Sequence, residues 1–223
     1  MVVRARQSSA PSAHPLRDPP VSRCQRRFHL RTVVGFSVTS FDAEQLRLLL
    51  AELSSRLEEC GVKGEMFLVG GAAMALAYSR RRATADIDAV FEPKSIIYEV
   101  AADMARLHGL DEGWLNDGVK GFLPGPDAQA GALLDLPGLA VAVASPRYLF
   151  AMKVFAARVD RDIDDLRTLY HLSKFQSLDE ALGYVAELYG SRPIAPRSEY
   201  VVREALAAEE LRQRGPKGPS LDL

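Results

Sequence analysis

The stretch FLVGGAAMALAYSRRRATADIDAVF at 67–91 constrains the fold of this chain more than any other part of its sequence. Residues 65–69, which are apolar from Met66 onward, predict a short buried strand that runs into the glycine pair Gly70–Gly71. The alanine-rich AAMALAY that follows is typical of a packed helix, and residues 84–91 alternate as a second strand after a basic turn. This order of elements predicts an α/β fold with a small mixed sheet flanked by helices.

The second strand carries an acidic pair. Because alternate residues of a strand point to the same face, Thr84, Asp86 and Asp88 are expected to project together, with Ala85 and Ile87 facing the core. Two ionised carboxylates this close repel each other unless one is protonated or a cation lies between them. Carboxylate oxygens suit Mg²⁺, which also binds substrate phosphates. The alternative for an isolated Asp-x-Asp is a solvated strand face.

The glycine pair adds a place for an anion. Gly70 and Gly71 lie between a strand and a helix, where bare backbone amides and the helix dipole can receive a phosphate. A phosphate-binding turn beside a metal-binding strand supplies the two requirements of nucleotidyl transfer. Arg82 and Thr84 are placed to contact the triphosphate, although Arg80–Arg82 could equally be solvated charge.

Charge is distributed unevenly along the chain. Residues 1–34 hold seven arginines and one acid, whereas the remainder holds 21 basic and 28 acidic residues. The Arg-, Ser- and Pro-rich residues 1–35 predict a disordered basic tail, with an RNA-binding arm as the alternative. Nucleic acid would therefore be bound through a local patch or through the tail.

Helical and strand patterns predict a mixed sheet-and-helix domain at 36–145, which would carry the nucleotidyl transfer, and a helical domain at 146–223. Residues 111–131 predict a loop, and Pro137–Gly138 predicts a hairpin turn between two strands. Helices are expected from Asp42 to Gly61, from Pro93 to Gly109, and at 146–159, 162–173, 178–189 and 198–212. No apolar run reaches the roughly 18 residues of a membrane span, and no secretory signal is evident, so a cytoplasmic protein is expected.

The stretch at 67–91 resembles the signature of the DNA-polymerase-β-type nucleotidyltransferase superfamily, which implies the nucleotidyltransferase fold. The later stretch YLFAMKVFAARVDRDIDDL at 148–166 resembles the AbiEii-like and MenT-like minimal nucleotidyltransferases of bacterial toxin–antitoxin pairs. The resemblance implies an active site completed by Lys153, Arg161, Asp162 and Asp165. It also implies Mg²⁺ as cofactor, an NTP and the 3′ end of a tRNA as substrates, inhibition of translation as the outcome, and a cognate antitoxin as partner.

The later charged residues also have local explanations. Lys153 lies in an apolar helix, where it could neutralise phosphate or reach the solvent with its ammonium group. Asp162 could cap the next helix, act as the active-site base or pair with the lysine, whereas Asp165 is expected to be structural. Asp135 is the best match for a third metal-binding carboxylate, with turn initiation before Pro137–Gly138 as the alternative.

Two further hypotheses remain open for the function. The acceptor could be a protein hydroxyl or a small molecule, which suits an acidic body without a basic stripe. The chain could also be a catalytically silent binding module that keeps the fold. In the loop at 114–125, Trp114, Lys120 and Phe122 could stack on bases and contact phosphate, although Trp114 could simply pack on the sheet.

Overall fold

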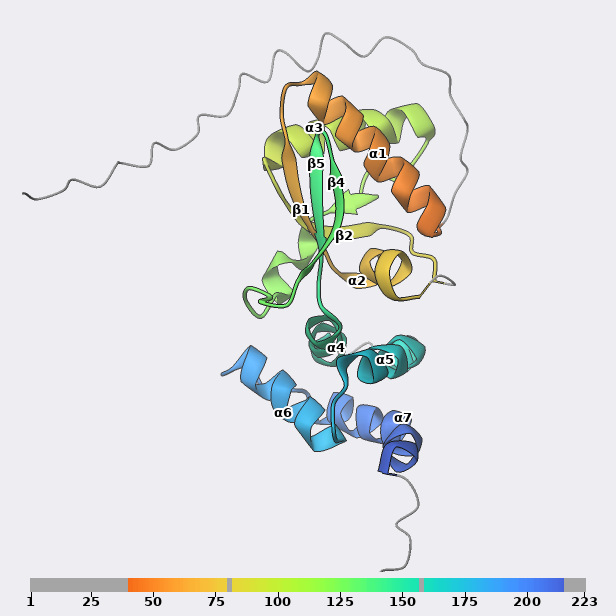
Figure 1. Ribbon diagram of the computed structural model, residues 1–223, viewed down its shortest axis with the longest axis vertical. Helices are drawn as coiled ribbons and strands as arrows, with labels where there is room; N and C mark the ends of the chain where they lie inside the picture. Colours follow the sequence, from red (N-terminus) through yellow and green to blue (C-terminus); the bar gives the residue numbers. More distant parts are fainter. Residues whose placement is uncertain (1–39, 80–81, 157–158, 215–223) are drawn as a thin grey trace, which may run out of the picture.

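The core of the protein is a five-stranded mixed sheet, as seen in a computed structural model that describes residues 40–79, 82–156 and 159–214 (Figure 1). The strand order is β3-β2-β1-β5-β4. The strands are β1 (Gly64–Leu68), β2 (Ile87–Glu92), β3 (Leu115–Asn116), β4 (Gly131–Leu136) and β5 (Leu139–Val143). This architecture confirms the predicted α/β fold. The predicted disordered tail at 1–35 lies outside the described residues.

The central strand β1 sets the direction of its neighbours. It pairs in parallel with β5 and antiparallel with β2, while β4 and β5 form the antiparallel hairpin expected around Pro137–Gly138. Met66 and Leu68 of β1 are buried on one face, whereas Glu65 on the other face is exposed. This alternation is the period expected of a strand with one covered face.

Helices α1 (Ala43–Glu59) and α3 (Lys94–His108) cover that face of the sheet. The side chain of Asp42 caps α1 by accepting hydrogen bonds from the backbone of Glu44 and Gln45. Gly109 ends α3 in the left-handed conformation, with φ of 65°. Both helices therefore begin and end where their sequence signals predicted. Among the described residues, no helix is long and apolar enough to cross a membrane.

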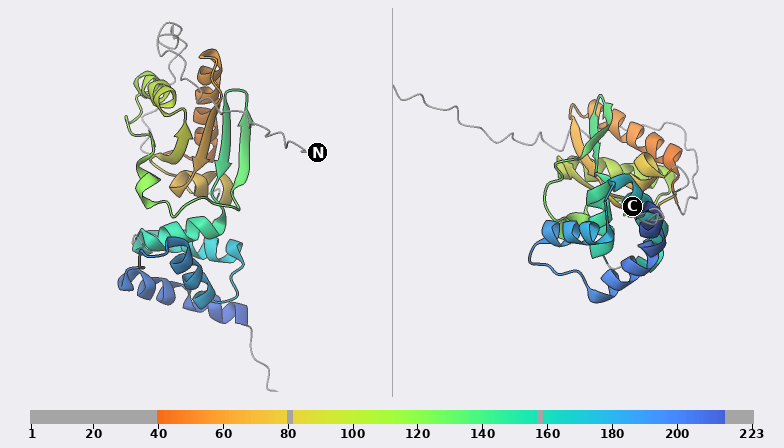
Figure 2. Two further views of the ribbon diagram at one scale, coloured as in Figure 1. Left: turned by 90° about the vertical axis from the view of Figure 1, so that its left-hand side faces the viewer. Right: turned by 60° about the horizontal axis from the view of Figure 1, so that its bottom comes forward.

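The second half of the chain is helical and lies beyond one end of the strands, where β1 ends and α2 begins (Figures 1 and 2). It consists of α4 (Pro146–Phe155), α5 (Val159–Ser173), α6 (Leu178–Tyr189) and α7 (Pro196–Arg214). Two tyrosines bind it to the loop before β4, because Tyr148 Oη donates to Gly125 O at 2.7 Å and Tyr189 Oη to Phe122 O at 3.0 Å. The division into two domains at 145/146 stays a prediction.

The structure departs from the predicted elements in three places. The strand expected at 84–91 begins only at Ile87, so Ala85 is exposed and does not face the core. Thr84 makes an isolated bridge to Phe41 instead. The helix after the glycine pair starts as α2 (Gly70–Ala73) and continues as the π-helix η2 (Met74–Tyr78). The predicted loop at 111–131 contains β3 and the 3₁₀ helix η3 (Gly118–Phe122).

The β4–β5 turn packs tightly on α1. Gly138 N–H donates to Ser54 Oγ at 3.0 Å, and a Cβ on Gly138 would lie 2.1 Å from Ser54 O. Since the obstacle is helix backbone, it cannot rotate away as a side chain could. Glycine is therefore required here by the distance between the turn and the helix.

We expect Gly138→Ala to lower the free energy of unfolding by about 2–3 kcal/mol, because the methyl group forces the hairpin away from α1. Chemical denaturation followed by circular dichroism measures this change. Gly183→Ala is the control, since a Cβ at this exposed position of α6 meets nothing within 4 Å. The control should be neutral or stabilise by up to about 1 kcal/mol. Equal stability of Gly138→Ala and wild type would contradict the packing argument.

Candidate active site

The glycine turn at the end of β1 lies directly against the acidic strand. Gly70 has φ of 61°, and a Cβ on it would lie 2.9 Å from Asp88 Oδ2. A Cβ on Gly71 would lie 2.4 Å from Thr84 Oγ1. Gly70 therefore disfavours a larger residue through its backbone conformation. At Gly71 a Cβ would also lie 2.9 Å from Thr84 Cβ, so one of the two residues would have to shift. The result is a turn of bare backbone in contact with Asp88 and Thr84.

The two aspartates occupy different structural positions. Asp88 lies in β2 and accepts a backbone hydrogen bond from Val69 N–H at 3.0 Å, which joins the strand to the glycine turn. Asp86 lies in the bend just before β2. Thr84 Oγ1 donates to Asp86 O at 3.1 Å and approaches Asp86 Oδ1 at 3.4 Å. The structure thus brings together the predicted residues Gly70, Gly71, Thr84, Asp86 and Asp88.

Asn116 also reaches the acidic pair, and the sequence analysis did not identify it. Asn116 Nδ2 lies 3.5 Å from Asp86 Oδ2, and Asn116 pairs in register with Asp88 across the β2–β3 ladder. The sequence did not predict this contact, because residues 111–131 were expected to form a loop and a strand of two residues shows no periodicity. The strongest signal available was a polar amide directly after the apolar pair Trp114–Leu115.

Four charged residues form a second group, here called the Lys153 cluster: Arg82, Lys153, Asp162 and Asp165. Lys153 Nζ lies 2.9 Å from Asp165 Oδ2 and 3.2 Å from Asp162 Oδ1. Arg82 Nη2 approaches the same two oxygens at 3.4 and 3.7 Å. Arg82 precedes β2, whereas the other three residues lie on α4 and α5. The cluster therefore joins the sheet part to the helical part of the chain.

Burial gives the members of the cluster different properties. Lys153 is only 9% exposed and Asp165 only 5%, so each needs its partner to offset the loss of water. The side chain of Asp162 is more accessible, at 15%. Arg82 Nε is buried and has no hydrogen-bond partner among the described residues, so it can still donate to an acceptor. The side chain of Arg161 lies outside the described part of the chain.

Asp135 lies far from this site, which corrects its assignment as a third metal ligand. It is paired with Ala140 of β5, which in turn pairs with Glu65 near the start of β1. The acidic pair lies at the opposite end of β1, beside Val69. The carboxylate of Asp135 is 79% exposed and pairs with Lys63 at 2.9 Å. Asp135 lies next to the β4–β5 turn, and this turn is at the end of the sheet opposite the acidic pair.

The oxygen donors at this site suit a divalent cation. Among the described residues, no group of three or more His, Cys, Asp or Glu side chains is placed to hold a metal ion. Mg²⁺ commonly needs only one or two carboxylates, because water and substrate phosphates complete its shell. Asp86 and Asp88 would hold such an ion, with the backbone of the glycine turn beside them.

Comparison with known protein families gives a match. Residues 44–182, more than half of the chain, match the family described as "Nucleotidyltransferase of unknown function (DUF6036)". The chain belongs to this nucleotidyltransferase family. The matched region contains both the acidic pair and the Lys153 cluster. No curated protein and no solved structure matched the chain.

In this nucleotidyltransferase, a polar network next to Asn116 holds the loop before η3. Asp117 Oδ1 accepts a hydrogen bond from Tyr98 Oη at 2.6 Å, and Asp117 Oδ2 forms an ion pair with Lys94 at 2.6 Å. The hydrogen bond from Lys94, followed by that from Tyr98, lowers the pKa of Asp117 from 3.8 to about 2. The charged form of Asp117 is therefore favoured by the folded state.

This shift predicts an acid-sensitive contribution to stability. Because the pKa of Asp117 is lower in the folded than in the unfolded chain, its contribution is complete above about pH 4 and disappears toward about pH 2. Asp117→Asn should therefore be less stable than wild type near neutral pH, and the gap should narrow as the pH falls through that window. Chemical denaturation of both proteins between about pH 6 and about pH 3 measures the gap. A constant gap would refute the role of the ionised carboxylate.

Proposed function

We propose that this nucleotidyltransferase transfers a nucleotidyl group from an NTP to an acceptor hydroxyl, with Mg²⁺ held by Asp86 and Asp88. The observation that carries the proposal is the close approach of the Gly70–Gly71 turn to Asp88 and Thr84. Backbone amides that suit phosphate thereby lie beside carboxylates that suit Mg²⁺. When bound, the ion would polarise the reacting phosphate and neutralise developing charge.

The reaction requires one displacement at phosphorus. The acceptor oxygen forms a bond to the α-phosphorus, and the bond from that phosphorus to the oxygen bridging to the β-phosphate breaks. Pyrophosphate leaves with the bridging oxygen, and the hydroxyl proton passes to a base. Asp162 is the candidate base, because it is the more accessible of the two carboxylates bound by Lys153.

Two cations would neutralise the triphosphate, Arg82 by direct contact and Lys153 from within its ion pairs. Lys153 is buried next to carboxylates that balance its charge in the absence of nucleotide. Arg82 has a buried Nε without a partner among the described residues, and its contacts to the same carboxylates are longer. A triphosphate could therefore bind Arg82 while the carboxylates of Asp162 and Asp165 remain paired with Lys153.

For the acceptor, we propose the 3′ end of a tRNA. The resemblance of 67–91 and 148–166 to minimal nucleotidyltransferase toxins supports this choice. Modification of that end would block aminoacylation and inhibit translation in the cytoplasm, and a cognate antitoxin would be the partner that prevents it. The excess of acids after residue 34 favours the second candidate, an acceptor on a protein or a small molecule.

The deciding experiment is a transfer assay with each labelled NTP, Mg²⁺ and total bacterial tRNA. We expect labelled RNA from wild type and a loss of roughly a thousand-fold or more for Asp86→Asn, because the substitution removes a metal-binding charge while keeping the side-chain shape. Asp135→Asn is the matched control. It removes the same charge from an exposed residue at the opposite end of the sheet and should keep full activity.

Each other outcome has a defined meaning. Labelling of protein or of a small molecule in place of RNA would keep the transferase and replace the acceptor. Full activity of Asp86→Asn would refute the metal assignment. Absence of any NTP binding by the wild-type chain would leave the silent binding module as the better hypothesis.

A further inference from the structure

Asn116 is the neutral neighbour of the acidic pair. We propose that it is a positioning residue of the metal site. Its amide nitrogen orients the carboxylate of Asp86, and its neutrality keeps a third negative charge away from Asp86 and Asp88. This inference rests on the proposed function and deepens it, since it names what sets the charge and geometry of the cation site.

The strand pairing places Asn116 at the site. β3 runs parallel to β2, with Ile87 opposite Leu115 and Asp88 opposite Asn116. Paired residues of adjacent strands project to the same side, about 5 Å apart. From there Asn116 Nδ2 lies 3.5 Å from Asp86 Oδ2. The amide therefore adjoins both members of the pair, one through the register and one through its nitrogen.

The hydrogen-bond pattern determines which end of the amide faces Asp86. Asn116 Oδ1 accepts from Gly118 N–H at 3.1 Å, while Nδ2 lies 3.5 Å from both Asp86 Oδ2 and Gly113 O. The reversed orientation would point an amide oxygen at two acceptors and an NH₂ group at a backbone donor. The donor end of the side chain is thus directed at the carboxylate.

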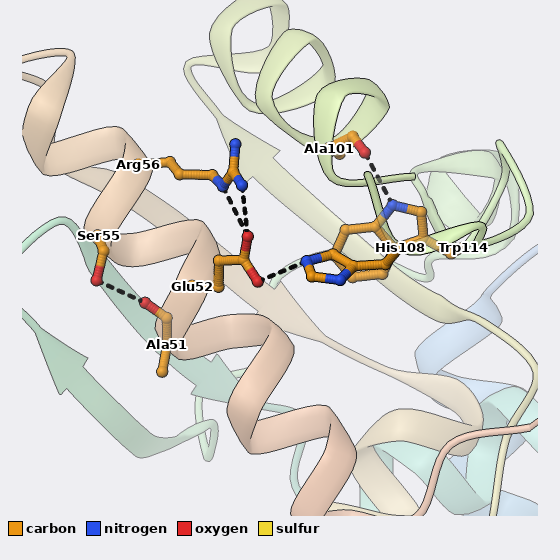
Figure 3. A network of polar contacts seen from close by, with 7 residues as sticks. All are labelled: Ala51, Glu52, Ser55, Arg56, Ala101, His108 and Trp114. Carbon is orange, nitrogen blue, oxygen red and sulfur yellow. Dashed lines mark hydrogen bonds and ion pairs between the residues drawn. The ribbon is translucent and has the colours of Figure 1, made fainter. Parts of the chain in front are cut away.

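The chain is anchored on both sides of Asn116. Before β3, Trp114 is buried and donates from Nε1 to Ala101 O at 3.0 Å, as Figure 3 shows. Trp114 O also accepts from Ile87 N–H at 2.6 Å. On the other side, Asp117 is bound by Lys94 and Tyr98. A side chain between two such anchors loses little further freedom when it orients Asp86.

The neutrality of the side chain matters because of what the site must bind. A carboxylate at 116 would place a third anion near Asp86 and Asp88, which raises affinity for a cation and repels a triphosphate. Among the described residues no such third acid joins the pair. With two carboxylates, more of the shell of an Mg²⁺ ion is left for phosphate and water. Asn116 would therefore balance cation affinity against triphosphate binding.

The test measures binding of Mn²⁺ alone to the full chain by electron paramagnetic resonance, together with transfer kinetics. We expect Asn116→Asp to bind Mn²⁺ about tenfold more tightly than wild type, because ligand charge sets cation affinity. The metal-free variant should melt at a lower temperature and recover when Mn²⁺ is added. Gln176→Glu, which adds the same charge at an exposed position of the helical part, should leave Mn²⁺ affinity unchanged.

Asn116→Ala separates positioning from structure. We expect it to raise the Mg²⁺ concentration needed for half-maximal transfer and to lower kcat several-fold, with KM for the NTP nearly unchanged. A merely structural role would lower the melting temperature without changing the Mn²⁺ spectrum or the Mg²⁺ requirement.

The outcomes distinguish the two proposals. If wild type binds Mn²⁺, Asp86→Asn does not, and both Asn116 variants behave as wild type, the positioning role is wrong while the proposed function stands. If wild type binds no Mn²⁺ with or without NTP, both are overturned.

Discussion

The contact between the glycine turn and the acidic strand is the constraint on which the site depends. Val69 donates to the backbone of Asp88, and the missing side chains of Gly70 and Gly71 let the turn approach Asp88 and Thr84. A Cβ at these positions would force the side chains of Asp88 and Thr84 to shift, which would disturb the contact between the turn and the strand. The same contact therefore closes the end of the sheet and brings backbone amides next to carboxylates.

Charge is handled in opposite ways at the two halves of the site. In the Lys153 cluster, two cations face two carboxylates, and this balance allows Lys153 and Asp165 to be buried. Among the described residues, Asp86 is instead approached by neutral groups, the hydroxyl of Thr84 and the amide of Asn116. The Lys153 cluster therefore balances its own charges, whereas the groups around Asp86 leave its negative charge available to a cation.

Most of the local structure followed from patterns within short segments. The cap at Asp42, the glycine at the end of α3 and the Pro137–Gly138 turn depend on residues only a few positions apart. The failures occurred where tertiary contacts decide. The strand expected at 84–91 starts late because Thr84 pairs with Phe41, a partner more than forty positions earlier in the chain. The two-residue β3 exists because Trp114 is buried against α3.

The sequence alone determined which residue types could serve the chemistry: a glycine pair, an Asp-x-Asp and a lysine in an apolar helix. Their roles depend on composition and near-neighbour spacing, which a linear pattern contains. Only the tertiary structure decided that Asn116 adjoins the pair, that Asp135 does not, and that Arg82 shares its carboxylates with Lys153. Those relations arise from the order of the strands and from packing of the helical part at the ends of the strands. Both are set by burial of apolar surface between distant segments, which no local pattern encodes.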